Sequence, residues 1–187
     1  MSYPMDRTQA IAYLKEIFTN PNMVNHCIAV ELIMVALAEH FGEDVEKWSL
    51  AGLLHDVDYA ETAKDPLRHG LLSAEMLEAK GFEGELVYAV KVHNDALGLP
   101  RISLFDKALF AADSLSGLIV AGALIHPSKK LAPLNTEFIL KRFHEKSFAR
   151  GANREHIATC SEMGLSLEEF ITLGLTAMQE HAAEIGL

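Results

Sequence analysis

The stretch Leu50-Ala51-Gly52-Leu53-Leu54-His55-Asp56 governs the interpretation of the whole sequence. Five apolar residues precede an imidazole and a carboxylate that stand side by side. Burying either polar group without a partner is costly, so the pair needs a compensating interaction. A divalent metal is one such interaction, because neutral imidazole and carboxylate both bind iron, manganese, zinc and cobalt. The alternative is a helix end, at which the His caps the helix and the Asp begins a turn.

Further His and Asp residues lie on both sides of this pair. His26 precedes it, and His69, His93 and Asp113 follow, each in a segment with helix-like spacing. A single His on an apolar face is more often a hydrogen-bonded core residue than a ligand. Asp113, however, stands in the apolar run 109–118, where a carboxylate needs a cation or several donors. Together these residues favour metal binding.

The order His, His-Asp, His, His, Asp resembles the HD superfamily of metal-dependent hydrolases in its six-ligand form. The resemblance covers about residues 20–125, and the later stretch 142–154 is similar to small bacterial and archaeal proteins described only as predicted HD hydrolases. It implies an all-α HD-domain bundle of about seven to nine helices. We therefore expect a single HD domain over residues 1–187, with the helices of 126–187 packed on the core.

The resemblance also implies how the ligands are shared between two ions. The first ion would be held by His26, His55, Asp56 and Asp113. His69 and His93 would add a second ion, with Asp56 as the bridge. Imidazoles mixed with carboxylates suit iron or manganese, with zinc, cobalt or nickel as alternatives, and fit magnesium less well.

Two acidic residues are candidates for proton transfer in such a site. Asp58, two residues after Asp56, is a candidate general acid or a residue that orients a ligand. Asp95, which follows His93, is the second candidate acid. The alternative for both is turn formation, because short loops are rich in Asp for that reason alone.

Basic residues are candidates for binding a phosphate group. Arg68 and Lys91 flank ligand positions, and an Arg can hold phosphate oxygens in a bidentate manner. The segment 126–156 is basic in an otherwise acidic chain, which predicts either an anion-binding rim over the site or a solvated helix face. The rim candidates are Lys129, Lys130, Arg150 and Arg154; Lys146 belongs to the same segment.

Composition limits the class of protein. The 187 residues are 50% hydrophobic and 22% charged, with six Pro, as expected for a helical globular protein. The net charge of −10 argues against binding to a nucleic-acid polymer. Cys27 and Cys160 show no CxxC spacing, which favours a reducing cytoplasm. No signal-peptide pattern is seen, and no uninterrupted apolar run reaches about 18 residues, so no membrane association is expected.

Local patterns predict where several helices begin. Asp6 with Gln9, Ser103 with Asp106, and Ser166 with Glu169 have capping-box spacing. A second helix is expected over about 23–38, with Asn22 as its cap. Residues 58–66 are expected to form a loop over the site, and a further helix is expected to start near Pro66 and to carry His69 in its first turns.

Three kinds of function fit these residues. The first is a metal-dependent phosphohydrolase acting on a nucleotide or another small phosphate compound. A cyclic dinucleotide is not expected, because Val57-Asp58-Tyr59 replaces the Ile-Gly-Lys of that branch of the superfamily. The second is a diiron oxygenase of the same fold, and the third is a non-enzymatic metal-binding regulatory module. Hydrolysis of a small nitrogen compound and assembly into a homo-oligomer are also open.

Overall fold

The computed structural model describes residues 3–145 and 147–187, so Met1, Ser2 and Lys146 lie outside it. All regular structure in these residues is helical, as expected, and eight α-helices have nine residues or more. The α-helices are α1 Arg7–Ile17, α2 Pro21–Phe41, α3 Val45–Leu54, α4 Tyr59–Thr62, α5 Leu71–Ala79, α6 Gly84–Val92, α7 Leu104–Ile125, α8 Thr136–His144, α9 Arg154–Ala158 and α10 Leu167–Glu180. Short 3₁₀ helices cover Asp95–Leu97, Thr159–Met163 and Ala182–Ile185.

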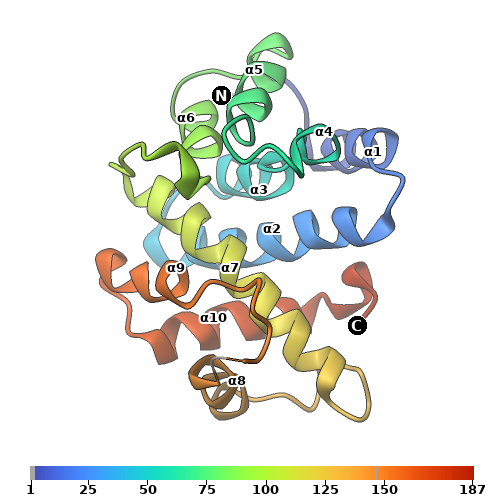
Figure 1. Ribbon diagram of the computed structural model, residues 1–187, viewed down its shortest axis with the longest axis vertical. Coiled ribbons are helices and arrows are strands. Elements are labelled where there is room, and N and C mark those ends of the chain that lie inside the picture. The colour runs from blue at the N-terminus through green and yellow to red at the C-terminus, as the bar shows by residue number, and fades with distance from the viewer. Residues whose placement is uncertain (1–2, 146) are drawn as a thin grey trace.

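The two longest helices, α2 and α7, cross at the centre of the bundle. Figure 1 shows α3, α4, α5 and α6 on one side of this crossing and α8, α9 and α10 on the other. Both central helices are apolar and long enough to cross a membrane, but 61% and 67% of their most apolar windows are buried inside the protein. Such burial is typical of core helices. The cytoplasmic location itself stays a prediction.

Local capping signals were good guides to several helix ends. The three expected capping boxes form at Asp6, Ser103 and Ser166. The expected cap of α2 was wrong: the side chain of Asn20 accepts the backbone N–H of Asn22, and Pro21 takes the first helical position.

The segment after Asp56 also differs from the expectation. Residues 59–62 form the short helix α4 within the expected loop. The following helix begins at Leu71 and not near Pro66, because Gly70 has a left-handed φ of 80°. His69 therefore lies in the turn before α5. A Cβ at Gly70 would also lie 3.0 Å from the carbonyl oxygen of Lys91, so this turn needs glycine.

A close approach of α2 and α3 sets the position of the His-Asp pair. A Cβ on Gly52 would lie only 2.6 Å from the Cα of Glu31, so the two backbones are in contact there. Glu31 is buried, and its carboxylate is satisfied by the guanidinium of Arg7 and the hydroxyl of Ser49. This contact brings the end of α3, with His55, against the side of α2 that carries His26.

Candidate metal centre

The structure brings all six expected ligands together around the Asp56 carboxylate. Its Oδ1 atom lies 3.4 Å from the Nε2 of His55, 3.4 Å from that of His69 and 3.3 Å from that of His93. Its Oδ2 atom lies 3.6 Å from the Nε2 of His26. Oδ1 therefore faces three of the imidazoles and Oδ2 faces the fourth, so Asp56 lies between His26 on one side and His69 and His93 on the other.

Asp113, in the middle of α7, completes the first group. Its Oδ1 atom is 3.1 Å from the Nε2 of His26 and 3.8 Å from that of His55. Two sets of residues each bring their donor atoms within 4.8 Å of one another. One set is His26, His55 and Asp56, and the other is Asp56, His69 and His93. Both sets of possible metal ligands therefore include Asp56, which lies between them.

Hydrogen bonds fix which nitrogen each imidazole presents to the centre. The Nδ1 of His55 donates to the carbonyl of Gly52 at 2.8 Å, and the Nδ1 of His93 donates to the carbonyl of Val90. Carbonyl oxygens can only accept, so each Nδ1 carries the proton and each Nε2 offers a lone pair. Partners of this kind commonly orient metal-binding histidines.

The donor atoms fit a bound cation. The Nε2 of His55 is buried and has no hydrogen-bond partner among the described residues. The Nε2 atoms of His69 and His93 face each other at 3.1 Å. Buried acceptors without donors are costly, and two facing lone pairs repel. Divalent ions would give the unpaired Nε2 of His55 a partner and would remove the repulsion between His69 and His93. These three imidazoles would hold the ions together with Asp56.

Asp58 lies behind His69 and holds it in place. Its Oδ1 accepts the Nδ1–H of His69 at 2.9 Å, and its Oδ2 accepts the backbone N–H groups of Gly70 and Ser73 at 2.8 and 3.1 Å. Burial opposes ionisation of this carboxyl, but the bond from His69 and the other donors hold its pKa below the usual range. These bonds support the orienting role proposed for Asp58 and speak against its role as a general acid.

The charges of the cluster are strongly coupled. Burial alone would lower the pKa of His26, but the bond to Asp113 and the charges of both carboxylates raise it to about 9. Burial lowers the pKa of His55. Burial opposes ionisation of Asp56 and Asp113, yet the surrounding imidazoles keep the pKa of each carboxyl lowered. Both carboxylates are therefore charged and ready to bind a cation.

Most of the expected phosphate-binding residues do not converge on the ligands. Arg68 is exposed and Lys91 of α6 is half-buried, and neither lines the cavities that reach the ligands. Lys129 and Lys130 are exposed and follow the far end of α7; Asp113 and Ile125 are about 18 Å apart along the helix axis.

Arg150 and Arg154 lie nearer to the ligands and differ in their contacts. Arg150 is exposed and lines a cavity of about 810 Å³ that also reaches Asp113. The Arg154 guanidinium donates to backbone carbonyls of the segment 142–152, among them those of Phe148 at 2.6 Å and Ala149 at 2.8 Å. These bonds hold the loop and speak against a role for Arg154 in binding substrate.

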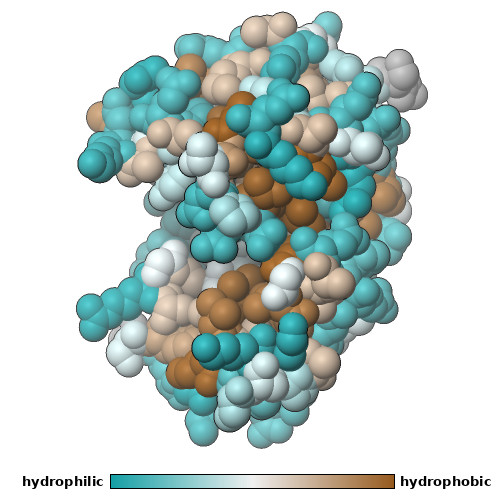
Figure 2. Space-filling view, turned by 90° about the vertical axis from the view of Figure 1, so that its right-hand side faces the viewer, coloured by the Kyte–Doolittle hydropathy of each residue, from teal (hydrophilic) through white to brown (hydrophobic). Residues whose placement is uncertain are grey.

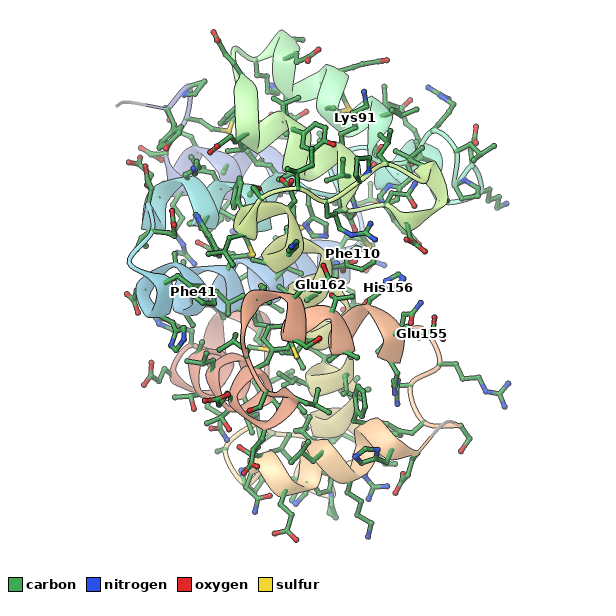
Figure 3. The ribbon with its side chains drawn as sticks, turned by 90° about the vertical axis from the view of Figure 1, so that its left-hand side faces the viewer. Phe41, Lys91, Phe110, Glu155, His156 and Glu162 are labelled. Atoms are coloured by element: carbon green, nitrogen blue, oxygen red, sulfur yellow. The ribbon has the colours of Figure 1, made fainter. Side chains whose placement is uncertain are left out.

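Sequence reasoning missed His156, which lines the same cavity as Arg150 and Asp113. Its ring stacks on Phe110 with centroids 4.2 Å apart, and Figure 3 shows the two side by side. Its Nε2 lies 3.7 Å from the carboxylate of Asp95, which is itself exposed. The sequence held no signal for His156, because its neighbours come from distant parts of the chain.

The ligands can be reached from outside. A cavity of about 310 Å³ opens directly onto four of them and is closed at its sides by Met23 and Tyr59; the four are His26, Asp56, His69 and Asp113. Tyr59, from α4, stands edge-on to His69 with ring centroids 5.6 Å apart. The segment expected to lie over the site therefore forms part of its mouth.

Known proteins share this part of the chain. The family described as HD domain matches residues 23–118, just over half of the chain. An uncharacterized protein of Methanocaldococcus jannaschii is 32% identical over 130 residues, which are 59% of this chain and 75% of that protein. Ribonuclease Y of Lawsonia intracellularis is 31% identical over 96 residues, or 51% of this chain and 18% of that enzyme. Ribonuclease Y 1 of Pediococcus pentosaceus is 29% identical over 140 residues, 72% of this chain and 26% of that enzyme.

Proposed function

Because the chain belongs to the HD domain family, we propose that it is a metal-dependent phosphohydrolase acting on a nucleotide or another small phosphate compound. The observation that carries this proposal is the paired arrangement of donors on either side of Asp56, open to solvent at one side. Two divalent ions held there would polarise a phosphate ester and lower the pKa of a water between them. Iron or manganese is proposed for both positions.

The chain's own residues prepare the site for this reaction. His55 and His93 are locked by their carbonyl partners, and His69 is locked by Asp58, so the donors are oriented before substrate arrives. In hydrolysis, the oxygen of a water forms a bond to phosphorus, the bond to the leaving oxygen breaks, and that oxygen takes up a proton. His156 lines the cavity of Arg150, and Asp95 lies 3.7 Å from its Nε2; this side is the proposed place of the leaving group.

The substrate is proposed to be small and not a nucleic-acid polymer. The chain matches only 18% and 26% of the length of the two ribonuclease Y enzymes, so their activity cannot be carried over as a whole. The net charge of −10 and the scattered basic residues disfavour a long phosphate backbone.

The other two functions predict different sites. A non-enzymatic module would close its ligands from solvent, whereas the cavity beside Tyr59 reaches four of them. A diiron oxygenase would need iron in both positions and would consume O₂. Measuring O₂ consumption alongside phosphate release distinguishes an oxygenase from a hydrolase.

The test is phosphate release from a panel of nucleoside monophosphates, simple phosphomonoesters, phosphodiesters and a short RNA, with manganese or iron added. We expect release from small phosphate compounds by the wild type and none by His55→Ala. His144→Ala, which changes an exposed His, is the matched control and should keep full activity. Oxygen consumption without phosphate release, cleavage of the RNA alone, or equal activity in His55→Ala would each overturn the proposal.

A further inference from the structure

A second cavity, of about 410 Å³, adjoins the metal centre at His26. Its walls are mostly apolar and come from α7 and the C-terminal 3₁₀ turn, with Val120, Leu124 and Ile185 among them. Asn22 and Asn25 of α2 form its polar side. We call this cavity the α2–α7 slot. Figure 2 views the side of the molecule that faces right in Figure 1, and shows hydrophobic side chains gathered below a hollow.

The slot is a direct continuation of the metal centre along two helices. On α7, Asp113, Gly117, Val120 and Leu124 follow one another at intervals of four, three and four, which puts them in one stripe. On α2, Asn22, Asn25 and His26 share a face for the same reason. His26 lines both the slot and the cavity that opens onto the ligands. A molecule bound at the ions can therefore extend into the slot along the outer side of the two helices, past His26.

Gly117 indicates that the slot is kept open for a ligand. Glycine inside a helix costs about 1 kcal/mol relative to alanine, so it usually has a packing reason. Gly122 and Gly174 have one, since an added Cβ would lie 2.7 Å from Ile139 and 2.8 Å from Leu115. A Cβ on Gly117 would meet only the Cβ of Ala152, at an ordinary 3.8 Å. The fold does not require glycine there, whereas close approach of a ligand to the helix backbone would.

The chemistry of the walls points to a flat ring with polar edges. Val120 and Leu124 offer an apolar surface, and 54% of Leu124 is exposed to solvent. The side chain of Asn25 makes no hydrogen bond with the described residues, and a carboxamide offers a donor and an acceptor together. Asn pairs in this way with the edges of nucleobases. Gly117 and Val120 lie about 6 and 10 Å along the axis from Asp113, an offset that a pentose can span.

We propose that the α2–α7 slot binds the base of a nucleoside phosphate whose phosphate group occupies the metal centre. The proposal rests on the proposed function for the position of the phosphate, but the slot can be tested without hydrolysis. It makes Asn25, Gly117 and Leu124 determinants of substrate choice. An alkyl phosphate, or a second protein chain covering Leu124, are the competing occupants.

The test measures binding of nucleosides, which have the base but no phosphate, by titration calorimetry on the metal-loaded protein. The probes are adenosine, guanosine, cytidine and uridine, with ribose as the ring-free control. The variants are Leu124→Ala, Asn25→Leu and Gly117→Ala. Ile125→Ala is the matched control, because Ile125 is exposed to the same extent, 54%, and follows Leu124 in the helix but does not line the slot.

We expect at least one nucleoside to bind and ribose not to bind. Leu124→Ala and Asn25→Leu should each weaken binding about tenfold, and Ile125→Ala should leave it unchanged. Gly117→Ala should weaken binding while raising the melting temperature, a combination that a purely structural glycine would not give. No nucleoside binding, or an equal loss in Ile125→Ala, would overturn the proposal.

The outcome is separable from that of the proposed function. If the wild type hydrolyses ring-free phosphate esters or prefers long-chain alkyl phosphates and binds no nucleoside, the slot assignment fails and the hydrolase stands. If nucleosides bind, the slot variants weaken this binding and no phosphate ester is cleaved, the slot assignment is supported and the proposed hydrolase function is wrong. Loss of a dimer in Leu124→Ala without any nucleoside binding would show that a second copy covers the slot.

Discussion

The Nε2 atoms of His69 and His93 lie 3.1 Å apart, and each ring already uses its Nδ1 proton for another bond. When both rings are neutral, the two facing nitrogens therefore both carry lone pairs, and no proton lies between them. A cation would relieve their repulsion, with Asp56 supplying negative charge 3.4 and 3.3 Å from the two nitrogens. His69 and His93 are therefore the residues that would make this a two-ion centre; without an ion between them, the site would hold one ion.

Replacing Asp58 with Asn tests how His69 is held. The amide can still accept one bond but loses the negative charge that orients His69 and the two backbone donors. We expect affinity for the second ion to fall about 10- to 100-fold, measured by metal titration. If metal affinity is unchanged and only turnover falls, Asp58 acts on the substrate as an acid and our assignment is wrong.

Gly52→Ala tests the contact that positions His55. The new Cβ would lie 2.6 Å from the Cα of Glu31, so α2 and α3 must separate. We expect a loss of about 1–3 kcal/mol in the free energy of unfolding, measured by denaturant titration, together with weaker metal binding. Gly117→Ala is the control, since its Cβ makes only an ordinary contact and it should be neutral or stabilising. Equal stability of the two variants would contradict the packing argument.

The two arginines near Asp113 should behave differently when each is replaced by alanine. Arg154→Ala leaves several carbonyls of residues 142–152 without their donor, so unfolding free energy should fall by at least about 2 kcal/mol and protease cleavage of this loop should increase. Arg150→Ala should leave stability unchanged and raise KM for a phosphate substrate. A stable Arg154→Ala protein with impaired substrate binding would restore Arg154 as a substrate ligand.

The raised pKa of His26 predicts how the metal-free protein responds to pH. Burial opposes protonation, but Asp113 and Asp56 raise its pKa to about 9, above the unfolded value of 6.5. Its contribution to stability is therefore fully present below pH 6.5 and is lost as the pH rises through 9. On the order of 2 kcal/mol should disappear over this range in chelator-treated protein, measured by thermal unfolding, and His26→Gln should flatten the profile. An unchanged profile in His26→Gln would show that another group is responsible.

The gathering of the six candidate ligands was predictable from sequence because their residue types are unusual where they occur. His55 and Asp56 follow an apolar helix, and Asp113 interrupts another, so both patterns favoured a cation over a simple helix cap or hydrogen-bonded core residue. Capping boxes were predictable because they involve residues only three positions apart. The start of α5 was not, because the left-handed turn at Gly70 is set by its packing against the carbonyl of Lys91.

Roles that depend on distant contacts could not be predicted. Arg154 looks like any basic residue in the sequence, and only the fold shows its guanidinium surrounded by carbonyls. His156 lacks a local motif, and its place beside Phe110 and Asp95 results from the packing of α9 on α7. The expected basic rim includes Lys129 and Lys130 only by sequence proximity, since the length of α7 carries them away from Asp113.

The most direct test of the central claim is the metal content of protein reconstituted with manganese or iron, measured by elemental analysis for the wild type, His69→Ala and His144→Ala. We predict about two ions per chain for the wild type and for His144→Ala, and about one for His69→Ala, because only the second position loses a donor. An unchanged content in His69→Ala, or no bound metal in the wild type, would contradict the two-ion centre built around Asp56.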